Sequence, residues 1–184
     1  MGTIKDFKYK LIKDFLSKEE LEIGCHYMNL KHKKNYSNFD PPEHKTINAD
    51  SFFFGDNFTE TIMMRKLKKM EQETKLELYP TYSFFRIYTF NSELKKHTDR
   101  ASCEISVTVM WESDGTPWPI YIEDKPIEMS PGDALIYLGC ELEHWRDNFE
   151  GDYHIQSFLH YVDKNGPYKD FKYDKRDNKT NPEK

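Results

Sequence analysis

Cysteine is scarce in this 184-residue chain, and the few cysteines follow no pairing pattern. Cys25, Cys103 and Cys140 lie far apart, their number is odd, and no C-x-x-C occurs. A disulfide framework needs an even set of cysteines, and thiolate zinc sites need closely spaced ones. The sequence argues against both and predicts a protein of the reducing cytoplasm.

Long apolar runs and an excess of basic residues are also missing. No run approaches the roughly 20 residues of a membrane-spanning helix, and residues 1–13 are too polar for a signal peptide. Lys and Arg number 27 against 32 Asp and Glu, a formal net charge of -5. Such a balance gives no global electrostatic footprint for nucleic acid, although a local basic groove is compatible with it. We therefore expect neither a membrane nor a nucleic acid as partner.

Aromatic residues, in contrast, are abundant at 15%, which favours a β-rich body over a helical bundle. The length is typical of one domain with a sizeable core. We expect a single domain over residues 1–184, in which residues 1–80 form helices and a loop. Residues 81–163 are expected to form a β-rich core, and residues 170–184 a flexible tail poor in apolar side chains.

The first 80 residues carry helix signals. Ser17 followed by Glu20 is a capping box and predicts a helix directly after it. Apolar residues at helical spacing predict a second helix over residues 57–78, which Thr59 can cap. The polar stretch 31–48 lacks periodicity and reads as a loop, and it could also be a lid that orders over substrate.

After Pro80 the apolar pattern alternates with a period of two, which is typical of strands. Turn residues rich in Gly, Pro and Asp separate the alternating runs, so we expect a small antiparallel sandwich or jelly roll. Helices precede the strands instead of alternating with them, which disfavours a doubly wound α/β sheet. The expected strands are 9–15, 83–90, 104–111, 118–123, 134–138 and 154–162.

His97 and Asp99 form the only His-x-Asp in the chain. Residues two apart on an extended backbone point to the same side, so both can bind one ion. His144, 45 residues after Asp99, is the candidate second histidine. Two histidines and one carboxylate on one face of a metal leave other positions open, as in non-haem Fe(II) sites. By itself, however, the motif is more often a surface histidine beside a solvated carboxylate.

The segments around this motif narrow the choice. In chain order they are Arg86-Ile87-Tyr88, His97-Thr98-Asp99-Arg100, Pro131-Gly132-Asp133-Ala134, Glu143-His144-Trp145-Arg146 and Phe158-Leu159-His160-Tyr161-Val162-Asp163. Together, from about residue 82 to residue 163, they resemble the catalytic half of a 2-oxoglutarate- and Fe(II)-dependent oxygenase of the prolyl 4-hydroxylase-like branch. Ordered segments at compatible spacing are far more specific than His-x-Asp alone.

The resemblance implies a mainly β fold with N-terminal helices, a double-stranded β-helix of the jelly-roll or cupin type. It implies that His97, Asp99 and His144 bind Fe(II), and that molecular oxygen and 2-oxoglutarate are co-substrates, with ascorbate supporting sustained turnover. Tyr88 stands where the family places a tyrosine that hydrogen-bonds 2-oxoglutarate. An inward-facing core aromatic is the equal alternative for Tyr88, since a buried phenol needs a polar partner in either role.

The sequence departs from the family at one position. About ten residues after the second histidine the family places Arg or Lys, which holds the far carboxylate of 2-oxoglutarate, and here that position is His154. We predict that His154 takes this role. Arg146 is the nearest guanidinium and the alternative, unless it forms an ion pair with Asp147 or Glu150.

Three functions are compatible with these motifs. The first is a hydroxylase of a peptidyl residue, with proline as the leading choice. The second is a hydroxylase of a free amino acid or small metabolite. The third is a metal-binding β-domain without turnover, against which the complete set of His97, Asp99 and His144 argues. The sequence does not decide between the first two.

Overall fold

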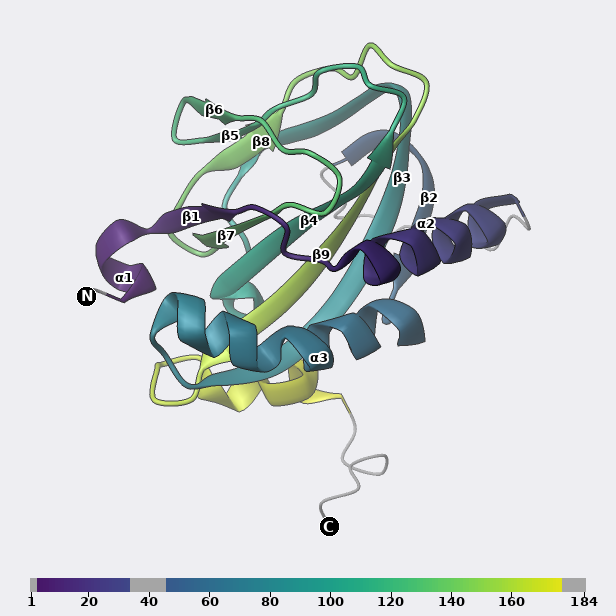
Figure 1. Cartoon of the computed structure of the whole chain (residues 1–184). Coiled ribbons are helices and arrows are strands. Elements are labelled where there is room, and N and C mark those ends of the chain that lie inside the picture. Colours follow the sequence, from purple (N-terminus) through teal and green to yellow (C-terminus); the bar gives the residue numbers. More distant parts are fainter. Residues whose placement is uncertain (1–2, 34–45, 177–184) are drawn as a thin grey trace.

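The computed structural model describes residues 3–33 and 46–176 (Figure 1). Its helices are α1 (Ile4–Phe7), α2 (Lys18–Lys33) and α3 (Asn57–Thr74), with the 3-10 helices η1 (Ala101–Cys103) and η2 (Lys169–Lys175). Its strands are β1 (Tyr9–Ile12), β2 (Thr46–Phe54), β3 (Leu78–His97), β4 (Ile105–Ser113), β5 (Ile120–Ile122), β6 (Lys125–Ile127), β7 (Ala134–Leu138), β8 (His144–Arg146) and β9 (His154–Asp163).

The strands form one strongly curled sheet in the order β1-β7-β4-β9-β3-β8-β5-β6, and β2 also pairs with β3. Every strand pair in the described residues is antiparallel. Neighbours in space are mostly distant in sequence, as in a jelly roll. The predicted mainly β fold with N-terminal helices, a double-stranded β-helix, is therefore confirmed.

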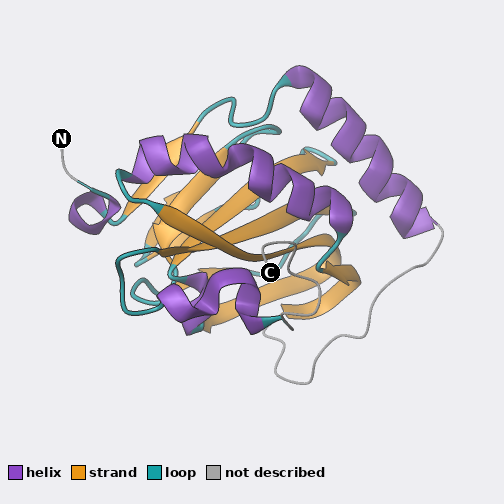
Figure 2. Ribbon diagram, turned by 90° about the horizontal axis from the view of Figure 1, so that it is seen from below, coloured by secondary structure: helices purple, strands orange, loops and turns teal. Residues whose placement is uncertain are grey.

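Helices α2 and α3 cover one face of the curled sheet (Figure 2). The core between them contains Trp111 and Phe85 from the sheet and Met70 from α3, all at most 1% exposed. Gly24 lies in the middle of α2, where a Cβ would overlap the Trp111 ring. The helix can therefore lie directly on the tryptophan only because this residue has no side chain. None of the helices in the described part of the chain has the length and apolarity needed to cross a bilayer.

The predicted capping box is present. The Ser17 amide donates to Glu20 Oε2 at 2.8 Å and the Glu20 amide donates to Ser17 Oγ at 3.2 Å, which starts α2. At α3, the predicted cap at Thr59 is wrong. Asp56 caps this helix because its carboxylate accepts from the amide of residue 58 at 2.9 Å. The helix also ends earlier than predicted, since Leu78 already begins β3.

The long strand β3 changes direction within its second half. Residues 89–92 form a bulge. The residues on either side of it, Tyr88 and residue 93, pair with β2 residues that are only two positions apart. Asn91 has a φ of 64°, a left-handed conformation that asparagine tolerates better than most residues. Beyond this bulge β3 leaves β9 and pairs with β8, so His97 comes to lie opposite His144.

Both ends of the stretch 31–48 differ from the predicted loop. Helix α2 continues to Lys33 and strand β2 starts at Thr46. Phe53 of β2 stacks on Phe85 of β3 with ring centroids 4.5 Å apart, so β2 belongs to the core. Residues 34–45, the middle of the stretch predicted as a loop or lid, lie outside the described residues.

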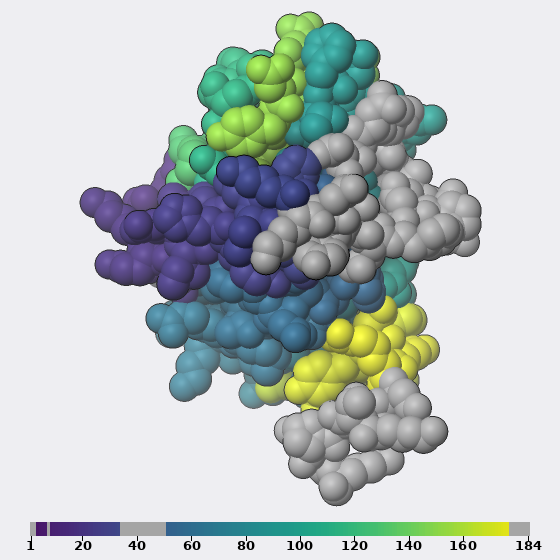
Figure 3. Space-filling model, turned by 90° about the vertical axis from the view of Figure 1, so that its right-hand side faces the viewer, coloured from purple at the N-terminus to yellow at the C-terminus, as the bar shows by residue number. Residues whose placement is uncertain are grey.

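The segment expected to be loose is folded up to Arg176. Helix η2 contacts β3, and Figure 3 shows this C-terminal part, in yellow, beside the blue α3 region. The guanidinium of Arg100 makes two hydrogen bonds of 2.8 Å to Asp174, and Arg176 pairs with Glu60 of α3 at 2.5 Å. The remaining part of the predicted tail, residues 177–184, lies outside the described residues.

Candidate metal centre

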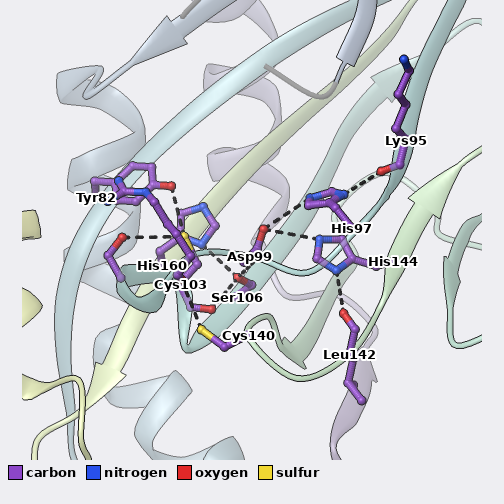
Figure 4. Close-up of polar contacts among 12 residues, drawn as sticks. Tyr82, Lys95, His97, Asp99, Cys103, Ser106, Cys140, Leu142, His144 and His160 are labelled. Atoms are coloured by element: carbon purple, nitrogen blue, oxygen red, sulfur yellow. Dashed lines mark hydrogen bonds and ion pairs between the residues drawn. The ribbon is translucent and has the colours of Figure 1, made fainter. Parts of the chain in front are cut away.

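Three side chains meet where β3 ends and β8 begins. His97 is the last residue of β3, His144 is the first of β8, and Asp99 follows β3 directly (Figure 4). Asp99 Oδ1 lies 3.4 Å from His97 Nε2 and 3.5 Å from His144 Nε2. The three ligand atoms lie within 4.8 Å of one another, close enough to bind one metal ion. The predicted set of two histidines and one carboxylate is thus brought together.

Backbone carbonyls fix both imidazole rings. His97 Nδ1 lies 2.7 Å from the carbonyl oxygen of Lys95, and His144 Nδ1 lies 3.0 Å from that of Leu142 (Figure 4). A carbonyl can only accept, so each Nδ1 carries a proton, and in a neutral ring Nε2 is then the atom that presents a lone pair. Such a hydrogen bond to the second nitrogen is the usual support for a metal-binding histidine. Both rings therefore have an orientation and a tautomer that are suitable for binding a metal through Nε2.

The Asp99 carboxylate is held by its other oxygen. The Ser106 hydroxyl donates to Asp99 Oδ2 at 2.7 Å, and His160 Nδ1 lies 3.0 Å from the same hydroxyl. The Asp99 amide donates to the carbonyl of Gly139 at 2.8 Å. A Cβ on residue 139 would lie 2.5 Å from both Asp99 Oδ2 and Ser106 Oγ. Gly139 therefore makes room for the carboxylate, and Oδ1 is left facing the two histidines.

The charge state of Asp99 also suits a cation. Burial alone would raise its pKa, but hydrogen bonds donated by protonated His144 and His97 rings, and the positive charge of such a His144 ring, lower it well below its usual range. Asp99 therefore remains a carboxylate at neutral pH. It contributes the negative charge of a set whose other two ligand atoms are imidazole nitrogens.

A second group of possible ligands lies behind the first. Cys103 and His160 also approach Asp99, and the three ligand atoms lie within 4.8 Å of one another. Burial raises the pKa of the Cys103 thiol far above its usual range, and the Tyr82 hydroxyl is 3.1 Å from its sulfur. A protonated thiol is a poor ligand. Cys103, through its carbonyl, and His160, through its Nδ1, instead contact the Ser106 hydroxyl and belong to the buried surroundings of Asp99.

The far end of the barrel holds an arginine. Arg146 is two residues after His144 on β8, so both side chains point into the barrel. Its guanidinium lies over the Trp118 ring, 4.7 Å from the centroid, and its Nη1 donates to the Trp118 carbonyl oxygen. Burial lowers the pKa of Arg146 to about 10, which still leaves it a cation at neutral pH. Among the described residues it forms no ion pair, so neither Asp147 nor Glu150 is its partner.

His154 and Gln156 complete this end. The hydrogen-bond network orients the Gln156 amide so that its oxygen accepts from Arg146 Nη2 at 2.8 Å and from His154 Nε2 at 2.9 Å. The amide nitrogen then donates to Thr108 Oγ1 and to the carbonyl of Val109. Burial, followed by the charge of Arg146, lowers the pKa of His154 well below its usual value. His154 is therefore a neutral imidazole whose Nε2 proton is already used.

Tyr88 lies between the two ends. It is 1% exposed, and its ring meets the Trp118 ring edge-on at 4.9 Å. It stands opposite His154 in the register of β3 and β9, and its phenol raises the pKa of Arg146 against the effect of burial. Both sequence-based alternatives fit this position, because Tyr88 packs in an aromatic cluster and also faces the cation.

A cavity of about 280 Å³ opens beside the far end. Arg146, His154 and Trp118 line it, together with Ser113, Thr116 and Glu128. His154 Nδ1 is buried and has no hydrogen-bond partner among the described residues. The wall of this cavity is thus partly cationic and partly aromatic.

Three supporting residues were missed by sequence reasoning: Ser106, Gly139 and Gln156. For Gly139 a signal exists, because a glycine directly after a strand often marks a close backbone approach. Ser106 and Gln156 sit at alternating positions of ordinary strands, where nothing local separates a supporting polar side chain from any other. Ser106 acts on Asp99, seven residues away in sequence, and Gln156 acts on Arg146, ten residues away. Only the fold shows that these pairs are in contact.

No protein-family model matches the chain, and no curated protein matches its sequence. Solved structures do match the fold. A Pseudomonas putida prolyl-4-hydroxylase has a TM-score of 0.67 at 14% identity, covering 88% of this chain and 97% of that one. A Trichoplax adhaerens prolyl hydroxylase, in complex with a hypoxia-inducible-factor peptide fragment, has a TM-score of 0.64 at 12% identity, covering 88% and 86%.

A third similar structure is EctD from S. alaskensis, solved with 2-oxoglutarate and 5-hydroxyectoine. Its TM-score is 0.64 at 12% identity, and the match covers 85% of this chain and 72% of that one. At these identities the similarity establishes the fold. The chain has the jelly-roll architecture of 2-oxoglutarate- and Fe(II)-dependent oxygenases.

Proposed function

We propose that this protein is a 2-oxoglutarate- and Fe(II)-dependent oxygenase. One observation carries the proposal: His97 Nε2, His144 Nε2 and Asp99 Oδ1 converge at the mouth of an oxygenase-type jelly roll. Two neutral nitrogens and one carboxylate oxygen on one side suit Fe(II) and leave other positions open. The backbone-fixed tautomers and the Ser106 bond to Asp99 support the same interpretation.

The residues present would hold Fe(II) through these three atoms. When bound, iron with oxygen and 2-oxoglutarate supplies an oxidation in which substrate R–H becomes R–OH while 2-oxoglutarate becomes succinate and CO2. The protein's own contribution is positional. The carbonyls of Lys95 and Leu142 keep both imidazoles in the binding tautomer, and Ser106 keeps one carboxylate oxygen away from the ion. Tyr88, Arg146 and His154 are the candidates for holding 2-oxoglutarate.

For the substrate we propose a peptidyl residue, with proline as the leading choice. The similarity to the P. putida prolyl-4-hydroxylase supports this choice, because the match covers 97% of that chain. The match to the metabolite-bound EctD covers 72% of that chain, so part of that enzyme has no counterpart in the match. A free amino acid or small metabolite is the alternative substrate.

The test is succinate formation by the Fe(II)-loaded protein with ascorbate, 2-oxoglutarate and libraries of proline-containing peptides or of metabolites. A peptide that stimulates succinate release and gains 16 mass units supports the proposal. Stimulation by a metabolite alone would move the substrate class to the alternative. No succinate above background with either library, from a protein that binds iron, would favour a metal-binding β-domain without turnover.

The metal ligands have their own test. Replacement His97→Ala should abolish 2-oxoglutarate decarboxylation and leave the thermal melt intact, because one of three ligands is lost. The matched control is His26→Ala, which removes an exposed histidine of α2 and should change nothing. Normal turnover by the His97→Ala protein would refute the assignment of the site.

A further inference from the structure

The guanidinium of Arg146 is a buried charge without an anionic partner among the described residues. Its residue is 2% exposed, and the acceptors that reach it are the neutral oxygens of Trp118 and Gln156. Glu128, which lines the same cavity, is exposed and acts on Arg146 only at a distance, because among these residues it makes no ion pair with it. A buried charge is costly unless it is paired, and in proteins such charges are normally matched by an opposite one. The missing anion points to a ligand.

We propose that Arg146, and not His154, binds the distal carboxylate of 2-oxoglutarate. The inference rests on the proposed function and adds to it the residue that selects a dicarboxylic 2-oxo acid over a monocarboxylic one. It places the cationic anchor on the strand of the second histidine, two residues after it, instead of on the following strand.

The position of Arg146 relative to the metal ligands supports this role. His144 and Arg146 point to the same side of β8, separated by about 7 Å along the strand. A five-carbon dicarboxylate that reaches the ion with one end can place its other carboxylate at about this distance. Tyr137 packs on His144 with ring centroids 4.7 Å apart, and Tyr88 meets the Trp118 ring, over which the guanidinium lies, with centroids 4.9 Å apart. Two phenols thus accompany the path between the metal end and the guanidinium.

The guanidinium is also held in place before any ligand arrives. Gln156 Oε1 and the Trp118 carbonyl each take one of its five N–H groups, and the Trp118 ring supports its face. Gln156 is in turn fixed by Thr108 and the carbonyl of Val109. These two neutral acceptors orient the guanidinium group without neutralising its charge. An oriented guanidinium fork matches the geometry of a carboxylate.

His154 lacks the donor that this role requires. Its Nε2 proton goes to Gln156 Oε1, so its Nδ1 carries a lone pair. That nitrogen is buried and has no partner among the described residues, and a lone pair repels a carboxylate. The ring edges meet Trp118 and Phe149, which fix its orientation. His154 therefore serves as a neutral neighbour of Gln156.

The experiment compares two ligands that differ only in the distal carboxylate: 2-oxoglutarate and 2-oxopentanoate. Their dissociation constants are measured by calorimetry with the Mn(II)-loaded protein, which does not turn over. Wild type is compared with Arg146→Gln, Arg146→Lys and His154→Gln, each first checked for its melting temperature and Mn(II) affinity. We expect wild type to bind 2-oxoglutarate about 10- to 100-fold more tightly than 2-oxopentanoate, the value of a charge-assisted hydrogen bond.

Arg146→Gln should erase this preference, leave 2-oxopentanoate binding unchanged, and place both ligands at a similar affinity. Arg146→Lys should retain part of the preference because the charge remains, whereas His154→Gln should retain nearly all of it. If the preference survives in Arg146→Gln and disappears in His154→Gln, the inference is overturned while the proposed function stands. Failure of wild type to bind Mn(II) or 2-oxoglutarate at all would instead count against the proposed function.

A second variant covers the case in which Arg146 replacements do not fold. Gln156→Glu keeps the size of the side chain and supplies an internal carboxylate 2.8 Å from Arg146 Nη2. It should lower the affinity for 2-oxoglutarate about tenfold, because the anchor's charge is already matched. Gln156→Met, which removes the hydrogen bonds without adding charge, is its control and should have the smaller effect. Equal effects of the two replacements would contradict the inference.

Discussion

The two ends of the barrel interior are complementary in charge. At the mouth, Asp99 is a carboxylate beside two imidazoles, a set suited to a cation. At the far end, Arg146 is a cation beside neutral oxygens and an aromatic ring, a set suited to an anion. Each end alone carries an unmatched charge. Together they fit a metal ion and a ligand that bears a carboxylate on the side away from the metal.

The ends also differ in how they are supported. Backbone carbonyls and a serine fix the mouth, and the side chains of His97 and Asp99 remain 12% and 15% exposed. A network of side chains, with the carbonyls of Trp118 and Val109 as backbone acceptors, fixes the far end, where Arg146 and His154 are each 2% exposed. The mouth can therefore exchange a metal and admit a substrate with little rearrangement. The far end depends on a packed network in which each polar group limits the next.

The largest effect on this comparison should come from filling the space behind Asp99. In Gly139→Ala a methyl group would come within 2.5 Å of Asp99 Oδ2 and Ser106 Oγ, so the carboxylate must move. We expect Mn(II) or Fe(II) affinity to fall by about 10- to 100-fold, as for loss of an outer-shell support. Metal titration measures the change. Ser106→Ala, which deletes one hydrogen bond without a clash, should give a smaller loss, and a larger loss in Ser106→Ala would contradict this picture.

A middle-sized effect should appear at the far end as pH falls. His154 has a lowered pKa in the folded protein, while the unfolded chain protonates near 6.5. Below that pH the unfolded state binds the extra proton and is favoured. The free energy of unfolding should therefore fall below pH 6.5, by at most about 1.4 kcal/mol per pH unit from this residue.

Urea unfolding at pH 7 and pH 5 measures the effect. His154→Gln should lose less stability between the two pH values than wild type does, since it has no proton to gain. Parallel losses in both proteins would show that His154 titrates normally in the folded state.

The smallest effects are expected around η2, which is tied to the residue after Asp99 by the Arg100–Asp174 pair. Asp174→Asn should cost at most about 1 kcal/mol, because the arginine side chain is 50% exposed and solvent screens the pair. Deletion of residues 177–184, which contain no apolar side chain except a proline, should leave the melting temperature unchanged. A drop of more than a few degrees on this deletion would show that these residues are docked on the fold.

The metal end was more predictable from sequence than the far end. His97 and Asp99 share a local motif, and His144 stood out through the resemblance of its segment, but neither β8 nor the second half of β3, which bring His144 to the other two, was among the expected strands. Arg146 was seen only as an alternative to His154, because spacing counts residues along the chain and carries no information on burial. The deciding facts are the neutral partners Trp118 and Gln156, which lie 28 residues before and ten residues after it.

The difference between local signals and contacts distant in sequence also explains the errors in the predicted elements. The Ser17 cap was predicted because its partner is three residues away. The start of α3 at Asn57 was predicted correctly, but its cap was assigned to Thr59 because Asp56 and Thr59 are both good capping residues, and Asp56 is oriented further by Tyr27 and Lys31 of α2. Strand β2 was hidden by a polar beginning, and its register depends on the bulge at Asn91. Tertiary contacts settled each of these cases.

The sheet order has a consequence for how the chain acquires its site during synthesis. Strand β9 is the last in sequence yet lies between β4 and β3, so without it the sheet falls into two halves. The three metal ligands belong to the half built on β3 and β8, whereas Ser106 and Gly139 belong to the half built on β4 and β7. Contacts so distant in sequence form slowly. A growing chain therefore has all three ligands before it has a rigid site, and it completes the site only when its final strand is inserted.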